Sequence, residues 1–253
     1  MRHLLLGLAV CALPLTAHAQ QKPAKPEDTE VWTPVPKIIT PGATAADAPS
    51  DAIVLFGGKN LDEWASQSGG PAGWTVRNGI ITVDKKAGDM HTKRKFTNFQ
   101  LHLEWSVPVG VVGSGQARGN SGVFLASTDD TGYEFQILDS YDNTTYVNGQ
   151  AASIYKQSPP LANAMRKQGK WQTYDIVWTA PTFNADGSLA TPARVTGFHN
   201  GVLVQNNFAL IGGTEYLGTP VYKAHGPAAI ALQAHGDPSL PINFRNIWVR
   251  ELN

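Results

Sequence analysis

The strongest constraint on the fold is a period-two alternation of apolar and polar residues, which begins near Asp51 and continues to the C-terminus. In FTNFQLHLEWSVP (96–108) every second side chain is apolar, and WQTYDIVW (171–178) repeats the pattern. Side chains of a strand point alternately to the two faces of a sheet, so this alternation predicts half-buried β-strands. The further predicted strands are residues 53–56, 121–127, 133–139, 229–235 and 242–252.

Two Asn-Gly pairs, Asn78-Gly79 and Asn200-Gly201, stand between β-like runs. Both residue types tolerate positive φ, which two-residue hairpin turns require. The chain carries 25 Gly and 17 Pro, and only LANAMRKQ (161–168) has a helical pattern, of two turns at most. Many short strands with glycine-rich turns predict an all-β protein, an antiparallel β-sandwich with few short helices.

The N-terminal 50 residues differ from the rest. Residues 1–19, MRHLLLGLAVCALPLTAHA, have a basic start, an apolar run and small residues at the end, which is the pattern of a cleaved secretory signal. The apolar run is too short to span a bilayer. Residues 20–50 hold six prolines and predict an extended tether, followed by a single domain over residues 51–253. We therefore expect an exported protein, periplasmic or extracellular.

Charge and cysteine content limit the partners. Removing residues 1–19 leaves 19 basic against 20 acidic residues, so no nucleic acid or anionic membrane partner is indicated, and a neutral polar ligand fits better. Cys11 is the only cysteine, and it follows a bulky valine where a lipid-attachment signal has a small residue. The mature chain then has no disulfide or Cys metal site and depends on its apolar core.

Several strands carry polar residues on the face opposite their apolar set. Three pairs stand in phase in this way: Glu134 with Gln136, Gln233 with His235, and Arg118 with Asn120. The simplest interpretation is that each pair lies on the solvated face of a half-buried strand. Carboxylate, amide and imidazole groups beside aromatic rings are, however, what a sugar requires. If these faces line one sheet, they form a concave polar floor for a carbohydrate.

Asp139 has the wrong parity for the Glu134 face. A buried, unpaired Asp would be unfavourable, so either the strand ends or bulges near Leu138 and Asp139 joins Glu134, or Asp139 is structural. In the first case the spacing E-x-Q-x-x-D is similar to the carboxylate strand of laminarinase-type retaining glycosidases, with Gln136 in place of the central acid. Such a pair needs its carboxyl groups about 5 to 5.5 Å apart.

Among the histidines, His235 is the strongest candidate, because it is in phase with Gln233 and precedes a glycine at a strand end. His225 lies in a loop with Gly and Pro that could reach the same site. A glycine-rich phosphate loop, G-x-S-x-G and H-E-x-x-H are missing from the sequence, which argues against a nucleotide site, an α/β-hydrolase nucleophile and a zincin.

These residues also carry a family resemblance. The segments that resemble the 3-keto-disaccharide hydrolase domain family, in order, are NSGVFL (120–125), YEFQILDS (133–140), GQAASIYKQ (149–157), WQTYDIVW (171–178), HNGVLV (199–204), LQAHG (232–236) and FRNIWVREL (244–252). The resemblance implies a concanavalin-like jelly roll of exported bacterial proteins that act on glycosides oxidised at C3. Ala126 and Ser127 stand where many relatives have Arg, so Arg118 is expected to supply that charge.

The resemblance implies an elimination and hydration route, in which a C3 ketone acidifies the C2 proton and the enolate expels the C1 substituent. Glu134 or His235 is then the base, and Arg118, Gln136 or a cation stabilises the enolate. The expected catalytic residues are Glu134, His235 and Asp139, and the expected substrate-binding residues are Arg118, Asn120, Gln136, Tyr155, His225 and Gln233. A divalent cation held by Glu134, Asp139 and His235 is an alternative stabiliser. Two alternative functions are a non-catalytic carbohydrate-binding module and a retaining glycosidase that uses Glu134 and Asp139.

Overall fold

The computed structural model describes residues 25–252, so the predicted signal segment, residues 1–19, lies outside the described residues. Within this range there are fifteen strands, three short 3-10 helices and no α-helix. The 3-10 helices are η1 (Pro26–Thr29), η2 (Gly115–Ala117) and η3 (Val147–Gly149). The strands are β1 (Ile53–Phe56), β2 (Trp64–Ser66), β3 (Thr75–Arg77), β4 (Ile80–Thr82), β5 (Met90–Thr92), β6 (Phe99–Ser106), β7 (Ser121–Ser127), β8 (Gly132–Ile137), β9 (Trp171–Thr179), β10 (Thr182–Phe183), β11 (Leu189–Thr191), β12 (Arg194–His199), β13 (Val202–Ala209), β14 (Ala229–Leu232) and β15 (Asn243–Glu251).

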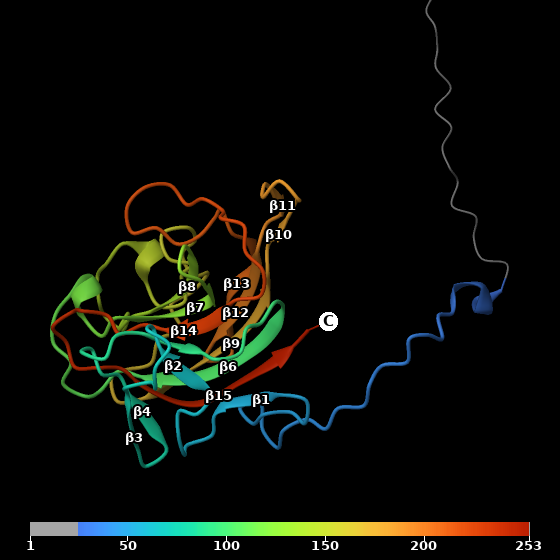
Figure 1. Ribbon diagram of the computed structural model, residues 1–253. Helices are drawn as coiled ribbons and strands as arrows, with labels where there is room; N and C mark the ends of the chain where they lie inside the picture. The colour runs from blue at the N-terminus through green and yellow to red at the C-terminus, as the bar shows by residue number, and fades with distance from the viewer. Residues whose placement is uncertain (1–24, 253) are drawn as a thin grey trace, which may run out of the picture. The chain divides into compact units, whose positions relative to one another are not determined.

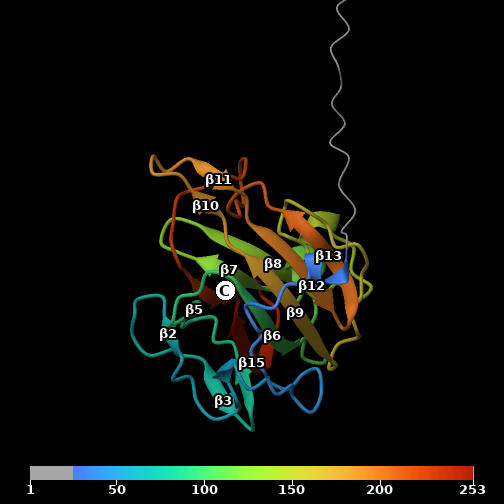
Figure 2. The ribbon, with the colours of Figure 1, turned by 90° about the vertical axis from the view of Figure 1, so that its right-hand side faces the viewer.

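The strands form two main sheets and a small hairpin. An eight-stranded sheet has the order β13-β12-β9-β6-β15-β4-β3, with β1 paired to β15, and a five-stranded sheet has the order β2-β5-β14-β7-β8. Figure 1 shows both sheets and the β10-β11 hairpin, and Figure 2 shows β13, β12, β9, β6 and β15 following one another across the larger sheet. Every strand pair in both sheets is antiparallel, which confirms the predicted all-β sandwich.

Aromatic side chains from both sheets meet in the core. The Tyr133 ring of β8 lies 5.3 Å from the ring of Trp178 on β9, and Phe135 lies 4.9 Å from Tyr174 in an edge-to-face contact. All four are fully buried. Ring pairs at this spacing add to the stabilisation from burying the rings themselves. The alternation of β8 therefore turns its aromatic residues to the core and leaves the opposite face of the strand free for other chemistry.

Both predicted hairpins are present. Asn78 and Gly79 have φ of 52° and 76° between β3 and β4, and Asn200 and Gly201 have φ of 53° and 79° between β12 and β13. Positive φ at both central positions is the geometry that Asn-Gly favours. Residues 161–168, the one segment with a helical pattern, form no helix.

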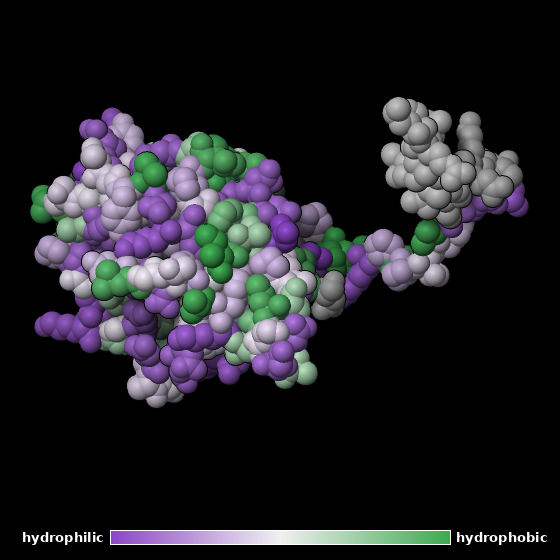
Figure 3. All heavy atoms as spheres, turned by 90° about the horizontal axis from the view of Figure 1, so that it is seen from above, coloured by the Kyte–Doolittle hydropathy of each residue, from purple (hydrophilic) through white to green (hydrophobic). Residues whose placement is uncertain are grey.

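The chain divides into two compact units, one ending at Ile38 and one beginning at Ile39. Residues 39–50, within the segment expected as a tether, thus belong with the sandwich: the carbonyl of Ala46 accepts hydrogen bonds from Asn246 and Trp248 of β15. Figure 3 shows hydrophilic residues over most of one face of the sandwich, with small groups of hydrophobic residues between them. No helix in the part of the chain that the structure describes has the length and apolarity to cross a membrane.

Candidate active site

A cavity of about 720 Å³ lies over the outer face of the five-stranded sheet. Six of the nine site residues expected from the sequence line it: Asn120, Glu134, Gln136, Tyr155, Gln233 and His235. They come from β8, from the approach to β7, from the segment after η3 and from the residues that follow β14. The other three expected residues, Arg118, Asp139 and His225, lie elsewhere.

Glu134 occupies the floor of this cavity. It lies on β8 in register with Phe124 of β7, so the two side chains share one face of the sheet. The next pair on the same face joins Gln136 to Gly122, and a Cβ at residue 122 would stand 2.6 Å from Oε1 of Glu134. The glycine therefore leaves the space that the Glu134 carboxyl occupies.

The surroundings of Glu134 keep its carboxyl protonated at neutral pH. The residue is 5% exposed. Burial disfavours the charged form, and repulsion from Asp89 adds to it, which together raise the pKa of Glu134 from 4.5 to about 8. A carboxyl group with its pKa near the working pH can act as a general acid or a general base.

The outer edge of β8 is covered by two other segments. The Gln136 N–H donates to the carbonyl of Ser153 (3.0 Å), and the Tyr155 N–H donates to the carbonyl of Glu134 (3.2 Å). Beyond Tyr155, the Glu134 N–H donates to Oγ1 of Thr214 (2.9 Å). These bonds replace a missing neighbouring strand, and they hold Tyr155 and Thr214 at the wall of the cavity.

Two amide oxygens in the cavity lining have no partner. Oε1 of Gln136 and Oε1 of Gln233 are buried and make no hydrogen bond within residues 25–252. The amide nitrogen of Gln136 is bound to Oε1 of Gln116 (3.0 Å), so its free oxygen has a fixed direction. Buried acceptors are normally satisfied, and a ligand hydroxyl is the group that these two can accept from.

His235 is held by a buried carboxylate. Its Nδ1 lies 3.1 Å from Oδ2 of Asp237, and Lys85 donates to the same Oδ2 (3.1 Å) and to the Asp237 carbonyl (2.6 Å). Burial alone would raise the pKa of Asp237, but the hydrogen bonds from His235, Ser239 and Lys85 outweigh it and lower the pKa to about 2.

The ionised Asp237 selects one tautomer of His235. The backbone N–H of Asp237 also approaches Nδ1, at 3.2 Å, but a charge-assisted bond to the carboxylate is the stronger of the two. Nδ1 then carries the proton, and the lone pair is on Nε2. The His235 side chain is 36% exposed and lines the cavity, so Nε2 is available as a base.

A tyrosine pair and a lysine form one wall of the cavity, next to β8. The hydroxyls of Tyr146 and Tyr155 lie 2.6 Å apart, and partial burial raises the pKa of both. The ammonium group of Lys156 lies 4.4 Å from the ring centroid of Tyr216 and donates to its carbonyl. An ammonium group has three donors, so Lys156 brings a positive charge with free hydrogen-bonding capacity to the lining of the cavity.

Arg118 and Asp139 pair with each other away from the cavity. Strand β8 ends at Ile137, and the following turn carries Asp139 to a fully buried position where its Oδ2 lies 2.9 Å from Nε of Arg118. This is a contact between charges, since the Nε–H is not aligned with the oxygen. Gln168 also donates to Oδ2 (2.9 Å). Asp139 therefore does not join Glu134, and the retaining pair is not assembled.

His225 also lies outside the cavity lining. Its Nε2 lies 3.1 Å from the hydroxyl of Tyr133, and its ring packs against Tyr133 and Phe183. These contacts place it at the edge of the aromatic core. The sequence predicts that this loop reaches the site, but the imidazole contacts Tyr133 and Phe183 instead of the cavity.

The three side chains considered for a divalent cation are not brought together. Within residues 25–252, no group of three or more His, Asp and Glu side chains could hold a metal ion. Asp139 is bound to Arg118, and the carboxylate beside His235 is Asp237. The residues of this chain therefore do not fit the cation site considered from the sequence.

Four contributors to the site were missed in the sequence: Lys85, Tyr146, Lys156 and Asp237. The contact between Asp237 and His235 could be predicted from their spacing, because a carboxylate two residues from a histidine can reach its ring. Lys85 reaches Asp237 across 152 positions of sequence, and no local pattern signals such a contact.

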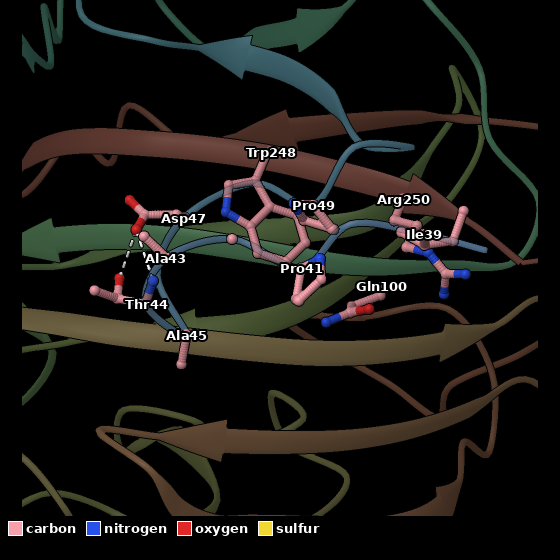
Figure 4. A pocket seen from close by; sticks show the side chains of 11 residues that line it. Ile39, Pro41, Ala43, Thr44, Ala45, Asp47, Pro49, Gln100, Trp248 and Arg250 are labelled. Atoms are coloured by element: carbon pink, nitrogen blue, oxygen red, sulfur yellow. Dashed lines mark hydrogen bonds between the residues drawn. The ribbon is translucent and has the colours of Figure 1, made fainter.

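A further hollow of about 580 Å³ lies on the other side of the molecule, between residues 39–49 and the eight-stranded sheet. Figure 4 shows Trp248 and Asp47 at this hollow. Asp47 already accepts hydrogen bonds from the backbone and hydroxyl of Thr44, and Trp248 is 3% exposed. The hollow has neither a second carboxylate nor a histidine in its lining, so it does not offer the acid and base chemistry of the first cavity.

Comparison with known proteins places the chain in a family. A family model for the 3-keto-alpha-glucoside-1,2-lyase-like domain matches residues 51–250. A 3-keto-disaccharide hydrolase from Bacteroides thetaiotaomicron is 27% identical over 157 residues, which cover 49% of this chain and 51% of that protein, so the match spans about half of its length.

Solved structures show the same fold. A crystal structure of a protein from Parabacteroides distasonis, assigned as a glycosyl hydrolase, is 55% identical with a TM-score of 0.85 and covers 90% of this chain and 97% of that one. A second protein of that organism, with the same assignment, has 20% identity and a TM-score of 0.58 over 80% of this chain and 94% of its own, and shows the fold alone. The family model and the first of these structures support a glycoside hydrolase-like function. Since the family model covers most of the chain, the protein belongs to the family of 3-keto-alpha-glucoside-1,2-lyase-like domains.

Proposed function

We propose that the protein cleaves glycosides, disaccharides among them, whose sugar ring carries a ketone at C3. The observation that carries the proposal is that one cavity holds both Glu134, a buried carboxyl with a pKa of about 8, and His235, a histidine oriented by an ionised aspartate. The unpaired amide oxygens of Gln136 and Gln233 would bind ring hydroxyls. Asn120 and Tyr155 are further proposed contacts for the sugar.

The proposed reaction begins at C2 of the oxidised ring. His235 Nε2 takes the C2 proton, and the electron pair moves onto the C3 oxygen as an enolate. When the ketone re-forms, C1=C2 becomes a double bond, the C1–O bond breaks, and Glu134 gives its proton to the departing oxygen. Water then adds across the double bond, with hydroxide at C1 and a proton at C2, so the net reaction is hydrolysis.

Lys156 is the proposed stabiliser of the enolate oxygen. Arg118 was expected in this role, but its guanidinium group is committed to Asp139. Gln136 offers its oxygen to the cavity, which is an acceptor and cannot stabilise an anion. Lys156 brings a positive charge, and a preorganised charge near developing negative charge is commonly the largest electrostatic contribution to catalysis.

A turnover assay tests the proposal. The protein is incubated with 3-keto-trehalose or 3-keto-lactose and with the unoxidised disaccharides, and released monosaccharide is measured. Release from the 3-keto sugars alone is expected, with loss of turnover and retained binding in Glu134→Gln. Binding without turnover would identify a carbohydrate-binding module instead. Release from ordinary disaccharides without preference for the ketone would contradict the C2 route.

We also propose that the protein is exported, on the basis of the pattern in residues 1–19. Cell fractionation of the native host should find the protein outside the cytoplasm, with an N-terminus beyond residue 19. A cytoplasmic protein that retains residue 1 would contradict export.

A further inference from the structure

A second hollow of about 260 Å³ opens on the same outer face of the five-stranded sheet. Phe124 lines both this hollow and the larger cavity, so the two meet at its ring. The second hollow is smaller than the roughly 300 to 1,000 Å³ of pockets for drug-sized ligands, which suits a single ring rather than a whole disaccharide.

One row of residues runs across the sheet beneath both hollows. His91 on β5 is in register with Ala231 on β14, Ala231 with Phe124 on β7, and Phe124 with Glu134 on β8. These four side chains therefore point to the same face. Adjacent strands are about 4.8 Å apart, so the backbones of His91 and Glu134 are separated by about 14 Å.

The floor between the two ends of the row is shaped to expose an aromatic face. A Cβ at Gly132 would stand 2.6 Å from Cδ1 of Phe124, so only a glycine at residue 132 lets the ring lie on the strand beside it. Ala231 is small and adds little height to the floor. An aromatic ring lying on an open sheet surface offers the flat apolar face against which the C–H surface of a sugar packs.

The rim of the second hollow carries hydrogen-bonding groups without partners. Within residues 25–252 the side chains of Gln67, His91 and Asp129 make no hydrogen bond, and Asp89 uses only Oδ1, which accepts from the Ala234 N–H (2.7 Å). These groups offer both donors and acceptors.

The charged side chains at the second hollow are acidic. Its lining includes the carboxylates Asp89 and Asp129 and no Lys or Arg. A neutral, hydroxyl-rich ligand is compatible with these charges, whereas an anionic ligand such as a uronate would be repelled.

We infer that this second hollow binds the leaving group of the glycoside, and that the leaving group it takes is a neutral sugar packed on Phe124. The inference rests on the proposed function, because Glu134, the proposed donor of a proton to the departing oxygen, is in register with Phe124, which lines both hollows. The oxidised ring then lies in the larger cavity with C2 toward His235, and the glycosidic oxygen lies at Glu134 with the second ring toward His91.

The test compares two substrates with the same oxidised ring. One is a 3-keto-disaccharide with a neutral sugar as leaving group, and the other is the methyl 3-keto-glucoside, which has no second ring. The measured quantity is the ratio of kcat/KM for the disaccharide to kcat/KM for the methyl glycoside. This ratio should fall about tenfold in His91→Ala and in Asp129→Ala, because each substitution removes one or two hydrogen bonds to the second ring. Asp130→Ala, an exposed neighbour outside the hollow, should leave the ratio unchanged.

An unchanged ratio in both variants would overturn the inference. A third substrate, a 3-keto-disaccharide with a uronate leaving group, should be poorer than the other two, and a preference for it would also refute the assignment. If the wild-type protein turns over none of them, the proposed function fails separately. Calorimetric binding of the 3-keto-disaccharide then decides: weaker binding in His91→Ala supports a sugar site here, and equal or undetectable binding overturns it.

Discussion

Replacing Glu134 with Gln should make the protein more stable at alkaline pH while removing its activity. The carboxyl is 5% exposed and no side chain in the described part of the protein donates a hydrogen bond to it. Its pKa is raised from 4.5 to about 8 by burial and by Asp89. The charged form is therefore destabilised in the folded state, and Gln, of the same shape, carries no charge to bury.

The dependence on pH follows from linkage. Below pH 4.5 the carboxyl is protonated in the folded and unfolded states, so it has no effect. Between 4.5 and about 8 the unfolded chain loses the proton and the folded chain keeps it, so stability falls as pH rises. At about 1.4 kcal/mol per pH unit the total loss is about 5 kcal/mol, reached above pH 8.

The assay is urea denaturation of wild type and Glu134→Gln at pH 5 and at pH 9. The variant should gain several kcal/mol relative to wild type between the two conditions, up to about 5. Glu251→Gln, at an exposed position of β15, is the matched control and should show no such gain. A difference between wild type and Glu134→Gln that does not change with pH would refute the account of the buried carboxyl.

Three further substitutions test how the site is held. Gly122→Ala should lower kcat about a hundredfold by displacing the Glu134 carboxyl, measured by steady-state kinetics on a 3-keto-disaccharide, since its Cβ would stand 2.6 Å from Oε1. Lys85→Met should lower kcat about tenfold and change the pH profile, because it removes donors from the carboxylate of Asp237 that orients the histidine. Arg118→Met should lower the free energy of unfolding by about 3 to 5 kcal/mol in urea denaturation, because it leaves a buried carboxylate unpaired.

Each has a control or a contradicting result. A fully active Gly122→Ala would mean that the glycine does not fix the position of the Glu134 carboxyl. Lys86 is an exposed neighbour of Lys85, and Lys86→Met should have the same kinetic constants as wild type. Wild-type stability in Arg118→Met would contradict the buried ion pair.

The alternation of residues was sufficient to predict the sandwich because burial acts on every strand in the same way. In β8 the parity of Tyr133, Phe135 and Ile137 set them in the core and left Glu134 and Gln136 on the outer face, as the structure shows. The hairpins were equally readable, since Asn-Gly requires no information from distant residues.

The parity of Asp139 raised a question that only the three-dimensional structure could answer. Its partner, Arg118, is 21 residues away, and Gln168 is 29 residues away on the other side, so neither contact follows from local pattern. The support of His235 by Lys85 is of the same kind. Site residues on strands could be predicted, whereas the residues that hold them in place depend on chain segments brought together by the fold.

The central claim, that a proton leaves C2 before the C1–O bond breaks, is tested most directly by turnover of a 3-keto-disaccharide in D₂O. Elimination and hydration place a proton from solvent on C2, so mass spectrometry and NMR should find one deuterium at C2 of the released keto sugar after a single turnover. The same keto sugar kept with Glu134→Gln corrects for spontaneous exchange. A released sugar without deuterium at C2 would contradict the account and indicate direct hydrolysis at C1.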